Sequence, residues 1–202
     1  MNILKPQKLN FKEFENKCLT DMSEEEINDY CNFENEECNN INLCEIEFEH
    51  CKFSNICMQN GKLEKLTFRD VIFEQCNFSN TEFVDASFIR CEFHNCKVAG
   101  CNFIENRLYN IFFMETNANY MNLSMSNIEN ILFKDSGLKN GYFQENRIKN
   151  IYFDNVDLTQ SKFFKTSLKG VDLSTSKIEG IAISTEDIKG AIIDEFQAVD
   201  LL

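Results

Sequence analysis

Three cysteines and a histidine within one short stretch are the side chains of this sequence best suited to chemistry. Residues 91–101, "CEFHNCKVAGC", contain Cys91, His94, Cys96 and Cys101. Thiolate and imidazole groups are the usual ligands of tetrahedral zinc, and the spacing C-x2-H-x-C-x4-C is compatible with such a site. The elements that carry these four side chains decide whether they can converge on one ion.

Composition narrows the range of partners. The 202-residue chain has 33 acidic and 20 basic residues and a net charge of −13. We therefore expect it to bind a basic protein surface rather than a nucleic acid or an anionic membrane. Neither a secretory leader nor an apolar stretch long enough to span a membrane is recognisable in the sequence. The expected location is the cytoplasm, where the ten cysteines would be reduced.

A five-residue repeat organises most of the chain. From Phe33 to Ile193 every fifth residue is apolar or small, in 33 consecutive positions without a change of phase. The residue two positions earlier is also small or apolar in all but four units. Neither a helix nor a flat strand has a period of five, and a separation of two places both series on one side of an extended segment. Each unit therefore points two side chains inward and three outward, and its third outward residue, often Asn or Gly, predicts a corner.

A longer, 20-residue period sets the number of units in a coil. Taking every fourth centre gives a column of seven phenylalanines, Phe33, Phe53, Phe73, Phe93, Phe113, Phe133 and Phe153. Such a column predicts four units per coil, with each ring stacked on the ring of the next coil. At about 4.8 Å per coil, the repeat predicts a rod of just over eight coils and roughly 40 Å.

The units CNFSN (76–80), CNFIE (101–105) and VDLTQ (156–160) match the pattern A-(D/N)-L-x-x. The sequence therefore resembles the pentapeptide-repeat family. The resemblance implies an all-β fold, a right-handed quadrilateral β-helix of about eight coils, over residues 31–195.

Within that family the sequence is most similar to the Qnr-type quinolone-resistance proteins. The similarity rests on IFFMETNANYMNLSMSNIEN (111–130) and on the way the chain leaves the repeat after residue 170. Qnr-type proteins are dimeric DNA mimics that bind DNA gyrase and topoisomerase IV, so the resemblance implies these partners and quinolone resistance. Several of them carry loops that interrupt the coils, whereas the register here is unbroken from 33 to 193.

Charge is distributed unevenly around the predicted rod. By the 20-residue period, the face centred on Phe33 to Ile193 carries nine acidic residues against two lysines, a net of −7, whereas the face centred on Phe48 to Ile188 has a net of +2. We call the former the acidic face and predict that it binds a partner. Its carboxylates include Glu34, Glu74, Glu92, Glu115, Asp135, Asp154, Asp172 and Asp194.

Large apolar side chains are expected on the surface of the same face, and solubility alone does not explain them. They are Ile72, Phe112, Met114, Leu132 and Tyr152. The alternative is that the acidic stripe only keeps the rod soluble.

The N-terminal segment, residues 1–30, is predicted to form a partial coil followed by an insertion. Leu9, Phe14 and Leu19 keep a period of five but lie one residue out of phase with the main series. Residues 23–30, SEEEINDY, are the candidate insertion, in which Ser23 and Glu26 would form a capping box for a short helical turn.

The C-terminal segment, residues 196–202, is predicted to be a short capping helix. Phe196, Val199 and Leu202 recur at roughly helical spacing, and Leu201 precedes the last of them. By resemblance this end would pair with a second copy in a homodimer. The alternative is a capping helix on a monomer.

Catalysis, metals and cofactors are not expected. The sequence contains no phosphate-binding loop, nucleophile elbow or H-E-x-x-H motif. In the five-residue register Cys91, Cys96 and Cys101 point inward on three successive faces while His94 points outward, so they cannot converge on one zinc ion. The register instead predicts reduced, buried thiols, with Cys96 above Cys76 and Cys51 above Cys31. Two hypotheses for function remain: a gyrase-binding DNA mimic, and a general interaction scaffold with an unknown partner.

Overall fold

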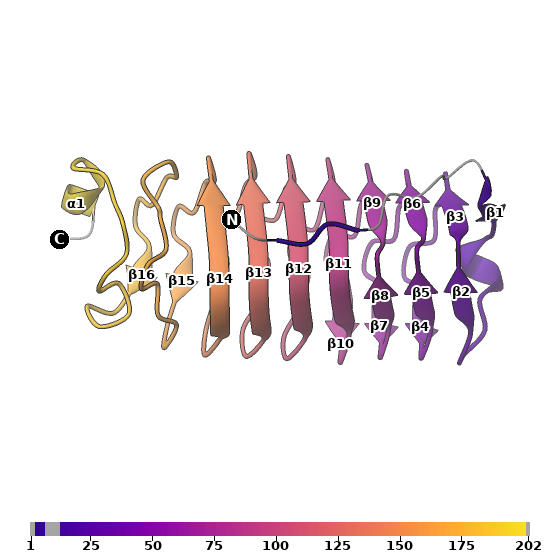
Figure 1. The fold of residues 1–202 in the computed structure, drawn as a ribbon. Coiled ribbons are helices and arrows are strands. Elements are labelled where there is room, and N and C mark those ends of the chain that lie inside the picture. Colours follow the sequence, from indigo (N-terminus) through magenta and orange to yellow (C-terminus); the bar gives the residue numbers. More distant parts are fainter. Residues whose placement is uncertain (1–2, 7–12, 201–202) are drawn as a thin grey trace.

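The computed structural model describes residues 3–6 and 13–200, and the chain winds into a rod of parallel strands (Figure 1). Two short helical elements lie near its ends, a 3-10 turn η2 (Leu19–Asp21) and the helix α1 (Gln197–Asp200). Neither has the length or apolarity needed to cross a membrane. The strands are β1 (Glu15–Asn16), β2 (Ile27–Asp29), β3 (Cys31–Glu34), β4 (Asn42–Cys44), β5 (Glu47–Glu49), β6 (Lys52–Ser54), β7 (Lys62–Glu64), β8 (Thr67–Arg69), β9 (Ile72–Glu74), β10 (Glu82–Val84), β11 (Ser87–His94), β12 (Arg107–Met114), β13 (Asn127–Lys134), β14 (Arg147–Asp154), β15 (Lys162–Phe163) and β16 (Ala182–Ile183).

Strand pairing confirms the predicted coil of four pentapeptide units. Phe33 pairs with Phe53, and Phe93 pairs with Phe113, so each partner lies four units farther along the chain. The same offset relates the other parallel strand pairs in the described part of the chain, apart from β1 with β3. The predicted β-solenoid of about eight coils is therefore confirmed.

Corners recur at every fifth residue, as the Asn and Gly positions predicted. Each multiple of five from Glu25 to Gly170 has a positive φ, for example 57° at Asn35. This left-handed conformation suits glycine and asparagine, yet Lys65 and Arg90 adopt it as well. Hydrogen bonds between coils hold the corners, since the Asn35 N–H donates to the Ser54 carbonyl at 2.9 Å. The stacking of coils thus overrides the local preference of individual residues.

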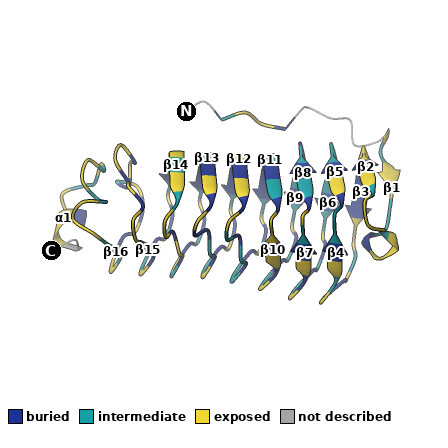
Figure 2. Cartoon of the chain, turned by 90° about the horizontal axis from the view of Figure 1, so that it is seen from below, coloured by how far each residue is buried: buried dark blue, intermediate teal, exposed yellow. Residues whose placement is uncertain are grey.

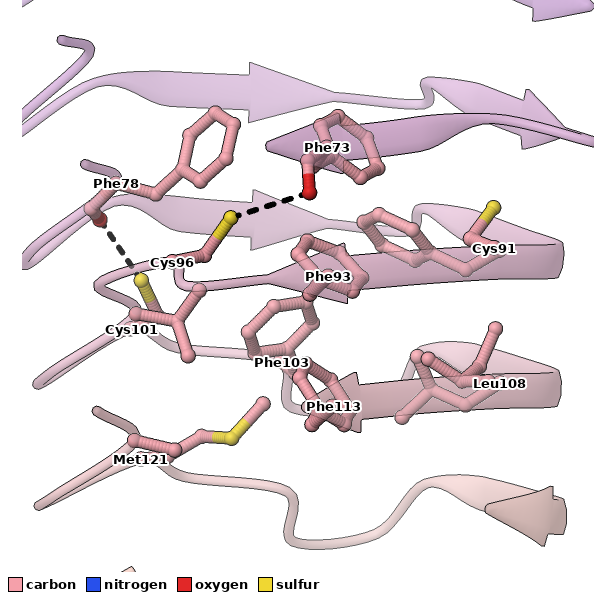
Figure 3. Close-up of a cluster of buried hydrophobic side chains, with 14 of the residues drawn as sticks. Phe73, Phe78, Cys91, Phe93, Cys96, Cys101, Phe103, Leu108, Phe113 and Met121 are labelled. Atoms are coloured by element: carbon pink, nitrogen blue, oxygen red, sulfur yellow. Dashed lines mark hydrogen bonds between the residues drawn. The ribbon is translucent and has the colours of Figure 1, made fainter. Parts of the chain in front are cut away.

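Stacked phenylalanine rings fill the core. Neighbouring ring centroids are 4.8 Å apart for Phe93 and Phe113 and 4.7 Å apart for Phe113 and Phe133, with interplanar angles of 16° and 6°. Figure 3 shows part of this column beside Phe103 and Leu108 from the adjoining faces. The rings are buried, so the predicted ladder is the hydrophobic core.

The N-terminal segment differs from the prediction. Residues 23–30 are not an insertion, because β2 pairs with β5 in the regular 20-residue register and corners lie at Glu25 and Tyr30. The helical turn is η2, which buries Leu19, although the Ser23 N–H does donate to Glu26 Oε2 at 3.1 Å. Glu15 pairs with Cys31 instead of Asn35, the partner that a full coil would give, so the first coil is shortened between β1 and Glu25. Regular coils therefore begin before residue 31, and Leu9 lies outside the described residues.

The C-terminal cap also differs from the prediction. Gln197, not Phe196 or Val199, closes the last coil, since its Nε2 donates to the carbonyls of Leu173 at 2.8 Å and Ser176 at 2.6 Å. Phe196 and Val199 are 76% and 71% exposed. A helix of only four residues can turn one side chain onto the coil while the others face away. Leu201 and Leu202 lie outside the described residues.

Candidate protein-binding face

The cysteines of residues 91–101 do not converge. Cys91, Cys96 and Cys101 donate their S–H groups to three different carbonyls of the preceding coil, those of Phe68, Phe73 and Phe78. Their Sγ–O distances are 3.4, 3.4 and 2.8 Å. Figure 3 marks the bonds of Cys96 and Cys101. All ten cysteines are free thiols, as the register predicted. The small inward position is therefore a hydrogen-bonding position as well as a packing one, and Thr116 uses its hydroxyl in the same way.

Burial also makes these thiols poor ligands and nucleophiles. Desolvation raises the pKa of Cys91 to about 12 and that of Cys101 to about 12. The pKa of Cys96 is raised still further, by burial and by the adjacent Cys76. Since the thiolate is the reactive and metal-binding form, thiols of this kind are inert at neutral pH.

The acidic face is built from three parallel rows of outward side chains, each running along the rod. The central row contains Ile72, Glu92, Phe112, Leu132 and Tyr152, which pair in register from β9 to β14. The second row lies two residues farther along each coil and runs from Glu34 to Asp154. The third is the corner row, which includes Glu115 and Asp135.

The central row is less exposed than the sequence predicted. Phe112 and Leu132 are only 5% and 6% exposed, and Glu92 only 7%. Ile72 and Tyr152, at either side of them in the row, are half-buried, as is Met114 in the second row. The expectation that Phe112 and Leu132 lie open on the surface is therefore wrong.

The N-terminal segment, residues 3–6, lies against these buried residues. It crosses β12 and β11 on the outside of the rod (Figure 1), and Figure 2 shows the same segment beyond the strands in the perpendicular view. The Leu4 N–H donates to Asn110 Oδ1 at 3.2 Å. Lys5 Nζ lies 3.5 Å from Glu92 Oε1 and 5.1 Å from the centroid of the Phe112 ring, and Pro6 is buried. We call residues 3–6 the strap.

Glu92 is ionised in spite of its burial. Desolvation opposes its charge, but the hydrogen bond with His94 at 2.6 Å and the charge of Lys5 outweigh that effect. The pKa of Glu92 is consequently held below its ordinary value. One acid of the acidic face is thus neutralised by contacts within the chain.

Other carboxylates of the acidic face also have internal partners. Both of its lysines are used in this way: Lys52 pairs with Glu74 at 2.8 Å, and Lys134 pairs with Asp154. Asp194 Oδ1 accepts the N–H groups of Phe196 and Gln197 at the start of α1. Asp172 accepts the hydroxyl of Ser174 at 2.6 Å, which lowers the pKa of this carboxyl.

Four of the predicted carboxylates stay exposed and have no basic partner within residues 3–6 and 13–200: Glu34, Glu115, Asp135 and Asp172, the last of which is bonded to Ser174. Glu34 lies in the second row, and Glu115 and Asp135 follow each other in the corner row. Asn155 Nδ2 donates to Asp135 Oδ1 at 2.7 Å, which orients that carboxylate without neutralising it. The structure thus brings Glu115 and Asp135 together and leaves Glu34 apart from them, toward the N-terminal end of the rod.

The model of a pentapeptide repeat region matches residues 66–140 and 86–163 of the sequence. The five-residue corners of the structure extend the same repeat beyond both ends of that match. The chain belongs to the pentapeptide-repeat family. No curated protein matches the sequence.

Solved structures of pentapeptide-repeat proteins resemble this one at low sequence identity. Full-length QnrB1, a plasmid-mediated fluoroquinolone resistance protein, is 20% identical over 97% of this chain and 93% of its own, with a TM-score of 0.45. HetL, involved in heterocyst differentiation regulation in the cyanobacterium Nostoc sp. strain PCC 7120, is 13% identical over 78% of this chain and 91% of its own, with a TM-score of 0.30.

One charged network of this pentapeptide-repeat protein was missed in the sequence. Asp70, fully buried at a corner, accepts two hydrogen bonds from Arg90 one coil away, at 2.7 and 2.5 Å. His50, one coil earlier in the same corner row, lies 3.8 Å from Asp70 and 2.8 Å from Asp29. The sequence does contain a signal for this network. An acid and a base 20 residues apart occupy the same position of successive coils and therefore pair, as Asp70 and Arg90 do.

Among the described residues, Asp29, Glu49 and His50 form the one group of acids and histidines close enough to share an ion. Glu49 already accepts a hydrogen bond from Arg69 at 2.8 Å, and Asp29 bonds to His50. These side chains are therefore satisfied by one another.

Proposed function

We propose that this protein is a non-catalytic DNA mimic that binds DNA gyrase or topoisomerase IV through its acidic face. The observation that carries the proposal is the polarisation of charge: nine acidic residues against two lysines on one face, with both lysines in ion pairs inside that face. The exposed carboxylates of Glu34, Glu115, Asp135 and Asp172 remain for a basic partner.

The neighbouring face would not compete for that partner. Arg107, Arg147 and Lys149 stand there around a surface hollow of about 570 Å³. A basic groove would therefore be attracted to one side of the rod and repelled from the next, which fixes the orientation of binding.

The spacing of charges supports partial mimicry. Corner residues of successive coils are separated by about 4.8 Å, whereas B-DNA presents one charge per about 1.7 Å of its axis. Glu115 and Asp135 therefore imitate only some of the phosphates that a DNA-binding groove accepts. Attraction of this kind steers association and weakens steeply with added salt.

We propose quinolone resistance as the consequence of this binding. QnrB1, to which this chain is similar, is a plasmid-mediated fluoroquinolone resistance protein. A protein seated in the DNA-binding groove of a type II topoisomerase would reduce the amount of enzyme–DNA complex on which the drug acts.

The test compares two charge-reversal variants in gyrase supercoiling and quinolone-stabilised cleavage assays. Glu115→Lys/Asp135→Lys reverses the two exposed carboxylates of the corner row. The control variant, Glu37→Lys/Glu179→Lys, changes the net charge by the same amount on a different face. Both residues are exposed on the face whose inward centres recur every 20 residues from Cys38 to Ile178. We expect the first variant to lose the effect on gyrase and the second to retain it.

Two results would contradict this function. If the parent protein leaves gyrase unaffected at micromolar concentration and low salt, gyrase is not the partner. If both variants lose the effect equally, the acidic face is not the binding surface. Capture of another basic protein, with gyrase untouched, would select the scaffold hypothesis.

We also propose that two copies pair through their C-terminal ends. The exposed side chains of Phe196 and Val199 support this arrangement, because large apolar groups on a cap are costly in a monomer. Sedimentation equilibrium of the parent and of Phe196→Asp tests it. A dimer that Phe196→Asp converts to a monomer is expected, and a parent that sediments as a monomer would refute it.

A further inference from the structure

The strap covers the acidic face without being part of the solenoid. Strands β11, β12 and β13 are each paired on both sides within the sheet, so the strap adds no strand to it. Its described contacts are with the side chains of Asn110, Glu92 and Phe112. The strap can therefore leave while every coil keeps its hydrogen bonds.

The strap contributes to burial in the central row. Glu92 and Phe112, which Lys5 contacts, are buried, whereas Ile72 and Tyr152 farther along the row are half-buried. All four occupy equivalent outward positions on the coils. Leu132 and Asn32 of the same row are buried as well, so the strap is one of several causes of burial along it.

We propose that the strap is an internal ligand of a peptide-binding site, and that the protein partner displaces it with an extended segment that places its own lysine between Glu92 and Phe112. The partner's identity as a basic protein rests on the proposed function. The site itself rests on the contacts of residues 3–6.

The site selects a lysine for two reasons. Glu92 is ionised and almost fully buried, so an occupant without a cation would leave its charge with the hydrogen bond from His94 as its only described polar partner. The Phe112 ring adds a second attraction, since Lys5 lies over its face at 5.1 Å from the centroid. The flexible stem of a lysine can reach both groups from a chain that passes above them.

Asn110 shows that the strap is an imperfect ligand. This side chain is fully buried; its Oδ1 accepts the Leu4 N–H and Asn130 Nδ2, but its own Nδ2 has no hydrogen-bond partner among the described residues. An extended peptide that offers a carbonyl as well as an N–H would satisfy both ends of the amide. A partner segment can thus bind better than the strap does.

Leu4 leaves further room for a partner. It is exposed and borders a surface hollow of about 350 Å³ that Tyr109, Asn110 and Lys149 also line. A larger apolar side chain at this position would fill space that Leu4 leaves open. The expected partner segment is therefore extended, with a large apolar residue next to its lysine.

Displacement has a measurable consequence. If the strap occupies the site nine-tenths of the time, binding of any peptide in trans is weakened about tenfold. Lys5→Glu would release the strap by placing a second carboxylate beside Glu92. Lys165→Glu is the matched control, because Lys165 pairs with Glu145 at 2.8 Å in a different part of the rod.

The experiment uses the full chain and two fluorescent peptides, MNILKPQK and MNILEPQK, whose binding is followed by anisotropy. We expect MNILKPQK to bind the Lys5→Glu protein about tenfold more tightly than the parent or Lys165→Glu. Glu92→Lys alone places a second cation beside Lys5 and also releases the strap, so this variant should lose MNILKPQK and prefer MNILEPQK. Equal binding of MNILKPQK to the parent and to the Lys5→Glu protein, or no change of preference in the Glu92→Lys protein, would overturn the proposal.

Hydrogen exchange provides a readout without any ligand. The Leu4 amide should be protected in the parent and in Lys165→Glu, and should exchange at the rate of an unstructured peptide in Lys5→Glu. Rapid exchange of Leu4 in the parent would show that the strap is not docked and would refute the proposal.

The gyrase assays separate this inference from the proposed function. If the strap controls access, Lys5→Glu should act on gyrase at lower concentration than the parent. If MNILKPQK binds as expected but gyrase is unaffected, the result refutes gyrase as the partner and leaves the strap proposal standing. If the parent and the Lys5→Glu protein act on gyrase identically, the result refutes control of access by the strap and leaves gyrase as the partner.

Discussion

The phenylalanine ladder makes a sharp prediction at Phe113. This ring is fully buried in the middle of the rod and stacks on Phe93 at 4.8 Å and on Phe133 at 4.7 Å. Phe113→Ala removes the ring and leaves a cavity between two neighbours that the backbone hydrogen bonds of the coils hold apart. The free energy of unfolding should fall substantially as a result.

The expected magnitude follows from two contributions. Truncation of a buried phenylalanine to alanine costs about 3–5 kcal/mol when the site cannot collapse. Part of this expected loss comes from the stacking of the rings. Each of the two ring contacts contributes about 0.5–1.5 kcal/mol in addition to the burial of apolar area. Phe113→Leu keeps most of the volume and loses both contacts, so we expect about 1–3 kcal/mol for that variant.

Urea denaturation followed by circular dichroism measures these differences. The matched control is Phe164→Ala, which removes the same ring from an outward, exposed position and should cost less than about 1 kcal/mol. Because coils stabilise mainly their neighbours, Phe113→Ala should also broaden the transition as the two halves of the rod uncouple. Equal stability of Phe113→Ala and Phe164→Ala would refute the view that stacked rings hold the coils together.

Three further predictions concern ionisable groups. In native protein at pH 8, iodoacetamide should modify the half-buried Cys44 and Cys57. It should not modify Cys91 or Cys101, because these thiols are buried and their pKa values are about 12. Early labelling of Cys91 or Cys101, detected by mass spectrometry, would contradict their burial. Arg90→Gln leaves the Asp70 carboxylate buried without its partner and should cost about 3 kcal/mol in urea denaturation, most of which Asp70→Asn restores in the double variant. The lowered pKa of Glu92 means that its charge stabilises the fold above the ordinary value of 4.5, and that this contribution is lost as the pH falls through the native pKa. The difference in stability between the parent and Glu92→Gln should therefore be present at pH 7 and should shrink as the pH falls below 4.5.

The periodic part of the structure could be predicted from the sequence because its contacts obey simple arithmetic. A residue at position n meets the residue at n + 20, so the ring column, the corners and the separation of Cys91, Cys96 and Cys101 all follow from one repeat. The same rule would have revealed the pair of Asp70 with Arg90, had it been applied to charged residues.

The exceptions lie where the repeat is interrupted or ends. The first coil is shorter than the others, so the phase of Phe14 and Leu19 did not show that η2 would bury Leu19 or that β2 would already be regular. At the other end, helical spacing identified α1 but not which of its side chains faces the coil. Gln197 does so because the last carbonyls of the coil need donors, which Phe196 cannot supply.

The sequence by itself thus determined the solenoid, its core and the uneven distribution of its charges, since each of these depends on neighbours at a fixed distance along the chain. Tertiary structure alone decided which parts of the acidic face are open. The strap contacts Asn110 across 106 residues and has no place in the repeat, so no period connects the two. Its docking depends on a lysine, a buried carboxylate and an aromatic ring meeting in space, and these contacts bury Phe112 and Glu92 while Glu115 and Asp135 stay exposed.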